Sequence, residues 1–358
     1  MTMLTRRVLN TIDVHAEGEL GKVVIASHLQ IRGTTMLERL AHAQEHYDGV
    51  RKLLLREPRG YPAACAVLVL PPVEPDSDFS MIVMEQGGFR AMSGSNLLCA
   101  VTALVETQTV AVDSSQLTLR IDTLAGLVEA HVAVANGRAM SVTFDNVPSF
   151  AVELDYALEV PGYGTVPVDI AFGGQFYVLA RAQDLGVTLS KDEAQQVIRA
   201  GSVMRAAAIE HFSVAHPLQD GIDEIGLAMI HGPADPDSAT AGRNAVVMPN
   251  GVVDLDNPAT WTGVLDRSPC GTGTSARMAA RFARGEMAVG DKLVHQGLLG
   301  TTFVGGIRGT TQVGPHEAIL PTIRGRGWII AYNQYVLSED DPFPEGYTLG
   351  DIWGPGSF

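Results

Sequence analysis

The sequence has 358 residues, of which 46% are hydrophobic and 18% are charged, and its net charge is −15. This length fits two domains of ordinary size, and the low charged fraction argues against long disordered or coiled-coil stretches. A surface this acidic repels phosphate backbones and anionic lipids, so we expect neither nucleic-acid binding nor attachment to a membrane surface.

The cysteine content and the absence of a targeting segment indicate a cytoplasmic protein. Cys65, Cys99 and Cys270 are too few for a disulfide scaffold and fit a reducing compartment. No apolar run approaches the ~18 residues that a membrane-spanning helix needs. Arg6-Arg7 resembles the start of a twin-arginine signal, but acidic residues follow it in place of an apolar stretch.

The first half of the chain alternates short β-like runs with turns rich in Gly, Pro and Asp. One strongly apolar stretch, 96–106, predicts a helix, and its apolar residues on nearly all sides predict that it is buried. The predicted strands are 23–27, 64–70, 81–84, 117–122, 127–134 and 141–144.

The second half repeats this pattern, with helices predicted over 191–215 and from Thr272 onward. We therefore predict two similar α+β domains that face each other, with a boundary near 146–154, where Pro148 interrupts the pattern. The strands predicted in this half are 176–180, 224–231, 243–248, 293–304 and 328–337.

Two related motifs mark the starts of the two central helices. Ser93 precedes Gly94, and Cys270 precedes Gly271. Free N–H groups and the helix dipole form an anion site at such a position, and the same field lowers the pKa of a thiol. Two such sites facing each other would hold a carboxylate, remove a proton from the adjacent carbon and stabilise the resulting enediolate.

Simpler explanations compete with this one. Each motif alone fits an ordinary helix cap, and a lone buried cysteine is usually inert. Two related motifs, one in each half, bring the catalytic interpretation level with the structural one. Gly271, Gly273 and Ala276 also fit a dinucleotide-binding fingerprint, although the preceding segment is not a buried strand. A nicotinamide oxidoreductase is therefore a minor alternative.

The run from Asp266 to Ala279 (Asp-Arg-Ser-Pro-Cys-Gly-Thr-Gly-Thr-Ser-Ala-Arg-Met-Ala) resembles the second catalytic motif of the proline racemase superfamily. This superfamily includes proline racemase, 4-hydroxyproline 2-epimerase and trans-3-hydroxy-L-proline dehydratase. Further matches follow in order over most of the chain, at 13–19, 57–60, 92–96, 125–126, 169–177, 216–217, 242–244 and 300–303.

The resemblance implies an α+β fold of the diaminopimelate-epimerase type. Two pseudo-symmetric domains, each a sheet or barrel wrapped on a central helix, would enclose the active site in the cleft between them. The N-terminal domain would comprise 1–147 and 335–358, and the C-terminal domain 148–334. The substrate would be a small imino acid, and neither a cofactor nor a metal would be used. The oligomeric state stays open, and a homodimer is one possibility.

The resemblance also implies roles for individual residues. Cys270 would be one acid/base, and Ser93 stands where racemases carry their first catalytic cysteine. Asp266 would meet the ring nitrogen. His216 and Asp220 fall near the ring hydroxyl by family position only, and His216 fits a structural role equally well. Four residues would bind the substrate carboxylate through backbone N–H groups: Gly94, Ser95, Gly271 and Thr272.

Other reactive residues have plainer explanations. His15 and Glu17 are two residues apart without a third ligand nearby, which is a weak metal signal. We expect Cys65 to line the pocket without taking part in the chemistry, and Cys99 to pack in the core.

The Ser/Cys pair resembles a subgroup of the family that acts on hydroxyprolines. A serine hydroxyl is a far weaker acid than a thiol, so the pair is unequal. Dehydration needs only one strong base at Cα, which favours conversion of trans-3-hydroxy-L-proline to Δ1-pyrroline-2-carboxylate, with side epimerase activity on 4-hydroxyproline. The alternatives are a 4-hydroxyproline 2-epimerase or proline racemase, and a binding protein without catalysis. Which of Ser93 and Cys270 removes the proton stays open.

Overall fold

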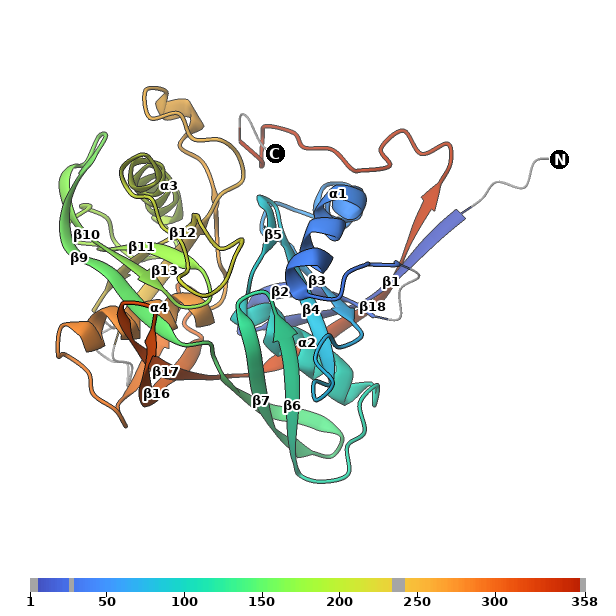
Figure 1. The fold of residues 1–358 in the computed structure, drawn as a ribbon. Coiled ribbons are helices and arrows are strands. Elements are labelled where there is room, and N and C mark those ends of the chain that lie inside the picture. Colours follow the sequence, from blue (N-terminus) through green and yellow to red (C-terminus); the bar gives the residue numbers. More distant parts are fainter. Residues whose placement is uncertain (1–5, 26–28, 234–241, 355–358) are drawn as a thin grey trace.

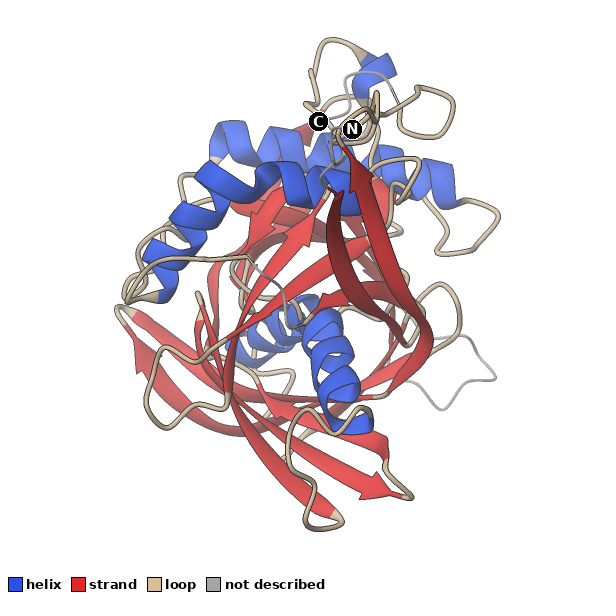
Figure 2. Cartoon of the chain, turned by 90° about the vertical axis from the view of Figure 1, so that its right-hand side faces the viewer, coloured by secondary structure: helices blue, strands red, loops and turns tan. Residues whose placement is uncertain are grey.

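The structure, a computed structural model, describes residues 6–25, 29–233 and 242–354. The chain forms two lobes side by side (Figure 1). In each lobe the strands curve around one helix, while another helix lies on the outside, as Figure 2 shows from the side. In the described ranges, no helix is both long enough and apolar enough to cross a membrane.

The first lobe encloses helix α2 (Gly94–Glu106). Every residue of α2 from Gly94 to Val105 is buried, which explains why the helix is apolar on all sides. Helix α1 (Met36–Leu55) packs outside on β3, β4 and β5. The strands pair in the order β18 (Gly327–Ser338), β1 (Arg6–Ala16), β2 (Glu19–Val24), β3 (Cys65–Leu70), β4 (Phe79–Glu85), β6 (Gln116–Thr123), β7 (Gly126–Ala135) and β8 (Arg138–Asp145).

The second lobe is a closed barrel around helix α4 (Gly271–Ala283). Helix α3 (Ala194–His211) covers it from outside, against β12 and β13. The strands pair in the order β9 (Ser149–Val160), β10 (Gly164–Phe172), β11 (Phe176–Arg181), β12 (Ile225–Gly232), β13 (Gly242–Met248), β15 (Lys292–Gln296), β16 (Thr302–Val313) and β17 (His316–Gly325), and β17 returns to β9.

The two lobes repeat one topology. In each lobe, the outer helix connects one pair of parallel strands, β2 and β3 in the first lobe and β11 and β12 in the second. The central helix connects a second parallel pair, β4 and β6 in the first lobe and β13 and β15 in the second. The short strands β5 (Gly88–Arg90) and β14 (Val264–Leu265) stand at equivalent positions, and the second lobe adds a 3-10 turn, η1 (Pro258–Thr260). The predicted pair of pseudo-symmetric α+β domains is confirmed.

The chain crosses between the lobes at two equivalent points. The first crossing lies at 146–148, between β8 and β9, close to the predicted boundary. The second lies at Arg326, where β17 ends and β18 begins. Because β18 pairs with β1 from Gly327 onward, the return to the first lobe starts there rather than at the predicted 335.

The C-terminal segment after β18 ties the lobes together. Trp353 is 1% exposed, and its Nε1 donates a hydrogen bond to Glu57 of the first lobe (2.6 Å). The carbonyl of Trp353 accepts a hydrogen bond from Asn250 Nδ2 of the second lobe (2.6 Å).

Candidate active site

The two central helices begin face to face. Gly94 and Gly271 are their first residues, and a Cβ added to Gly94 would come within 3.1 Å of the Cα of Gly271. The N–H groups in the first turn of a helix lack carbonyl partners within the helix, and the positive end of each dipole lies there. The junction therefore favours an anion.

A small cavity lies at this junction. It contains all of the predicted carboxylate-binding residues, together with Ser93, Cys270 and Asp266. The sequence prediction also placed Cys65 at the pocket wall. Six further lining residues were not predicted: Glu19, Glu85, Gln175, Tyr177, Leu227 and Met248.

Ser93 caps α2 in an extended conformation (φ −145°). Its Oγ accepts a hydrogen bond from Asn96 Nδ2 (3.0 Å) and lies 3.3 Å from Ser95 Oγ. These contacts hold the hydroxyl oxygen at the helix start, with a donor that stabilises negative charge on it.

Cys270 precedes α4 in the left-handed region (φ 58°), which is uncommon for a residue other than glycine. The strain is held by the neighbouring turn, in which Cys270 N donates to Ser268 Oγ (3.1 Å). The Sγ atom lies 3.4 Å from the hydroxyl of Tyr177, and that hydroxyl lies 2.7 Å from Thr272 Oγ1. The fold therefore aims the sulfur into the cavity at a fixed position.

The cavity raises the pKa of the Cys270 thiol well above its ordinary value. Burial is the main cause, and the nearby carboxylate of Asp266 adds to it. The Tyr177 hydroxyl and the Gly273 amide act in the opposite direction but do not prevail. The expectation that the helix field lowers this pKa is therefore wrong, because loss of hydration on burial outweighs the opposing backbone contribution.

Carboxylates gather beside the sulfur. Burial raises the pKa of Asp266 to about 6, even though its Oδ1 accepts a hydrogen bond from Ser268 N (2.7 Å). Burial and the charge of Asp266 raise the pKa of Glu19 well above its usual range. The Glu19 oxygens accept from Arg267 N (2.6 Å) and from Cys65 Sγ (3.3 Å). This side of the cavity thus favours a cation, whereas the helix starts favour an anion.

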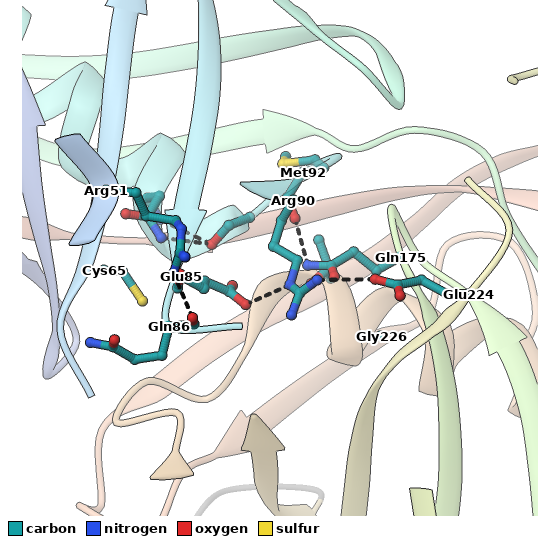
Figure 3. A network of polar contacts seen from close by, with 12 residues as sticks. Arg51, Cys65, Glu85, Gln86, Arg90, Met92, Gln175, Glu224 and Gly226 are labelled. Atoms are coloured by element: carbon teal, nitrogen blue, oxygen red, sulfur yellow. Dashed lines mark hydrogen bonds and ion pairs between the residues drawn. The ribbon is translucent and has the colours of Figure 1, made fainter. Parts of the chain in front are cut away.

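Contacts between the lobes hold the cavity wall (Figure 3). Arg90 Nε lies 2.9 Å from a carboxylate oxygen of Glu85 in its own lobe, and Arg90 Nη1 lies 3.0 Å from Glu224 of the second lobe. Gln175 Nε2 donates to the carbonyl of Met92 (2.8 Å), the residue before Ser93. The turn before Ser93 is therefore positioned partly by the opposite lobe.

His216 and Asp220 do not line the cavity. The ring of His216 packs on Phe150 and Phe172, at centroid distances of 5.6 and 4.7 Å, and its Nδ1 accepts from Leu218 N (3.2 Å). Asp220 is exposed. This geometry gives no support to a contact between either residue and the substrate hydroxyl.

Potential metal ligands lie elsewhere. Among the described residues, the one group of three such side chains is Glu129, His131 and Asp145, on β7 and β8 outside the cavity. His15, the other candidate, stacks its ring on Trp328 with centroids 5.0 Å apart. The structure also gives no support to a dinucleotide site at Gly271, Gly273 and Ala276. A pyrophosphate would lie at the first turn of α4, and the start of α2 at Gly94 packs there instead.

The sequence matches the proline racemase family over residues 11–348. The chain belongs to the proline racemase family. Among its relatives is the 4-hydroxyproline 2-epimerase of Streptosporangium roseum, 40% identical over 347 residues (97% of this chain and 100% of the relative). The proline racemase of Clostridioides difficile is 33% identical over 343 residues (96% and 98%).

Solved structures of proline racemase family members have the same fold. The hydroxyproline epimerase from Agrobacterium vitis, with trans-4-hydroxy-L-proline bound, superposes with a TM-score of 0.90 at 34% identity and covers 99% of both chains. A methylitaconate-delta-isomerase (TM-score 0.51, 12% identity) shares the fold alone. The protein is thus an enzyme of the proline racemase family, and its named relatives favour an isomerase over the dehydratase that the sequence analysis preferred.

Proposed function

We propose that this protein is a 4-hydroxyproline 2-epimerase that moves the α-proton without a cofactor. One observation carries the proposal: a single cavity joins two facing helix N-termini, a carboxylate cluster, Ser93 and Cys270. A zwitterionic imino acid has the matching charges, with a carboxylate for the amides and a ring ammonium for Asp266. The names of the full-length relatives support the same choice.

The helix starts provide the electrostatic part of catalysis. Amides of Gly94, Ser95, Gly271 and Thr272 hold the substrate carboxylate. As the α-proton leaves, negative charge moves onto the carboxylate oxygens, and donors already aimed at that position stabilise it without reorganisation. The substrate ammonium beside Asp266 favours the ionised form of that carboxyl, whose pKa burial raises to about 6.

Ser93 and Cys270 carry the protons. One of them removes the α-proton from one face of the ring, and the other delivers its own proton to the opposite face. Each turnover therefore leaves the pair with exchanged protonation states. The ring cation of the substrate lowers the pKa of Cys270 from its raised value, which favours loss of the thiol proton to water before the α-proton is taken. Asn96 Nδ2 supports negative charge on Ser93 Oγ.

Dehydration of trans-3-hydroxy-L-proline is the second candidate, and the serine at position 93 favours it. The hydroxyl is a weaker acid than the thiol, and β-elimination needs only one base at Cα. The α-proton and the 3-hydroxyl leave as water, and the enamine tautomerises to Δ1-pyrroline-2-carboxylate.

A three-substrate panel in deuterated water tests the proposal. We expect trans-4-hydroxy-L-proline to be converted to cis-4-hydroxy-D-proline with one deuterium at Cα, measured by NMR and optical rotation. Imine from trans-3-hydroxy-L-proline, detected with o-aminobenzaldehyde, without exchange on the 4-hydroxy substrate would replace epimerisation with dehydration. The absence of deuterium from all three substrates, L-proline included, would leave only a binding protein.

A further inference from the structure

A second recess lies in the second lobe, outside the active-site cavity. It is formed by the C-terminal half of α4 together with β10, β11 and β12. Its wall also contains His231 from β12. Four arginines line it: Arg181, Arg277, Arg281 and Arg284.

Carboxylates neutralise three of the four arginines. These contacts are ordinary ion pairs at or near the surface, and they leave no surplus charge on those side chains. The pairs are Arg284 with Asp155 (2.8 Å) and with Asp169, Arg281 with Glu286 (3.2 Å), and Arg181 with Asp184 (2.6 Å).

Arg277 differs from the other three. Within the described residues, its guanidinium has no carboxylate within ion-pair distance, and its one side-chain partner is His295 Nε2 (2.7 Å). Burial and the charge of Arg281 lower the pKa of Arg277 to about 10, so it still carries its charge at neutral pH. A recessed charge without a counter-ion is unfavourable, and an anion that reached it would relieve that cost.

The charge of the arginines also acts on His231, which lies on the same wall. The pKa of His231 lies well below its ordinary value. Burial is the main cause, and the charges of Arg277 and then of the three other arginines add to it. Asp155, Asp169 and Glu286 line the same recess, so the place for an anion is beside Arg277, which has no carboxylate partner among the described residues.

The hydrogen bond to His295 leaves most of the guanidinium available. It uses one of the five N–H groups of Arg277. His295 Nδ1 lies 2.7 Å from Thr274 Oγ1, which donates to the carbonyl of Pro269 (3.2 Å), the residue before Cys270. Arg277 therefore has a structural link toward the catalytic turn and a free side that faces the recess.

We propose that this recess binds a small oxyanion, a carboxylate or a phosphate, on the guanidinium of Arg277. The planar fork of an arginine matches two oxygens of such a group. The ligand lies on the same helix as the active-site amides but contacts a different part of it.

Calorimetric titration with inorganic phosphate and with succinate, at constant ionic strength, tests the proposal. We expect wild-type protein to bind at least one of the two anions, and Arg277→Gln to bind it at least tenfold more weakly. Arg308→Gln is the matched control, because it removes an exposed arginine of β16 and should leave affinity within twofold. The tighter anion identifies the class of ligand.

Three outcomes would overturn the site. They are no heat of binding with either anion, equal affinity in Arg277→Gln, or an equal loss in Arg308→Gln, which would mean nonspecific charge attraction. Arg277→Lys keeps the site testable if Arg277→Gln does not fold, since lysine keeps the charge and a donor for His295. We expect it to fold with the wild-type circular dichroism spectrum and to bind severalfold more weakly than wild type, with the fork lost.

Discussion

Gly94 and Gly271, the first residues of the two central helices, pack against each other, with no room for a side chain on Gly94 and little on Gly271. A Cβ on Gly94 would lie 2.8 Å from Phe144 Cζ and 3.1 Å from the Cα of Gly271, and a Cβ on Gly271 would lie 3.3 Å from the Cα of Gly94. Two helix N-termini from different lobes can approach this closely only because both begin with glycine. The opposed amides of the proposed carboxylate site depend on this contact.

We expect Gly94→Ala to disturb that contact. The new methyl group must displace Phe144 or separate the helix starts, which should cost about 1–3 kcal/mol of unfolding free energy and at least tenfold in kcat/KM. Gly350→Ala is the control, because no atom lies within 4 Å of a Cβ built there, and it should change neither quantity measurably. Wild-type kinetics in Gly94→Ala would mean that the amides do not bind the carboxylate.

Substitutions of Ser93 should separate the two proton transfers. Ser93→Ala leaves Cys270 as the only acid/base, so we expect epimerisation to be lost while one enantiomer of 4-hydroxyproline still exchanges its α-proton with deuterated water. The enantiomer that exchanges identifies the face on which Cys270 acts. Ser93→Cys supplies a thiol with an ordinary pKa near ~8.5 and should raise the ratio of epimerisation to dehydration severalfold. Normal epimerisation by Ser93→Ala would exclude the serine as an acid/base.

Asp266 should oppose stability at neutral pH. Its pKa is about 6 in the fold, against 3.8 ordinarily, because burial disfavours the charge. Between these values the folded state binds more protons than the unfolded state, so this group makes stability fall as the pH rises from about 4 to about 6. We expect Asp266→Asn to raise the unfolding free energy at pH 7 by about 1–2 kcal/mol, with no gain below pH ~4, and to lose activity.

Thermal unfolding of the wild type and Asp266→Asn across pH 3–8 measures this difference. A constant offset between the two proteins would show that the effect does not come from ionisation. Retained kcat/KM in Asp266→Asn would remove the ring-ammonium contact from the mechanism.

Local patterns in the sequence were enough to predict the two helix starts that meet at the cavity. Ser93-Gly94 and Cys270-Gly271 are helix starts that a reader can find in the sequence, and the repeated pattern of strands and helices predicts two lobes. The pKa of Cys270 could not be predicted in this way. The helix dipole is a local property, whereas burial and the neighbouring carboxylate arise only when distant segments meet.

The missed residues reach the cavity only through long-range pairing, and two of them, Glu19 and Tyr177, lie within the matched segments 13–19 and 169–177. Glu19 begins β2 and reaches the backbone of Arg267 in the other lobe. Tyr177 contacts Cys270 because β11 passes beside α4. Helix α1 escaped prediction although Thr35 and Glu38 form a capping box at its start, a signal that the sequence does carry.

Trp353 offers a test of closure between the lobes. Trp353→Ala removes a fully buried indole and its hydrogen bond to Glu57, while the backbone carbonyl that accepts from Asn250 Nδ2 remains, and it should cost about 3–5 kcal/mol in stability. Trp353→Phe keeps a ring but loses the donor to Glu57, which should cost about 1 kcal/mol. The cavity lies between the lobes, so weaker contacts of the C-terminal segment with the lobes should raise KM for 4-hydroxyproline more than they lower kcat. We expect the larger rise in KM in the alanine variant. Steady-state kinetics below the unfolding temperature of each variant separates this effect from global unfolding. An unchanged KM in a folded Trp353→Ala would mean that the C-terminal segment stabilises the chain without controlling access to the cavity.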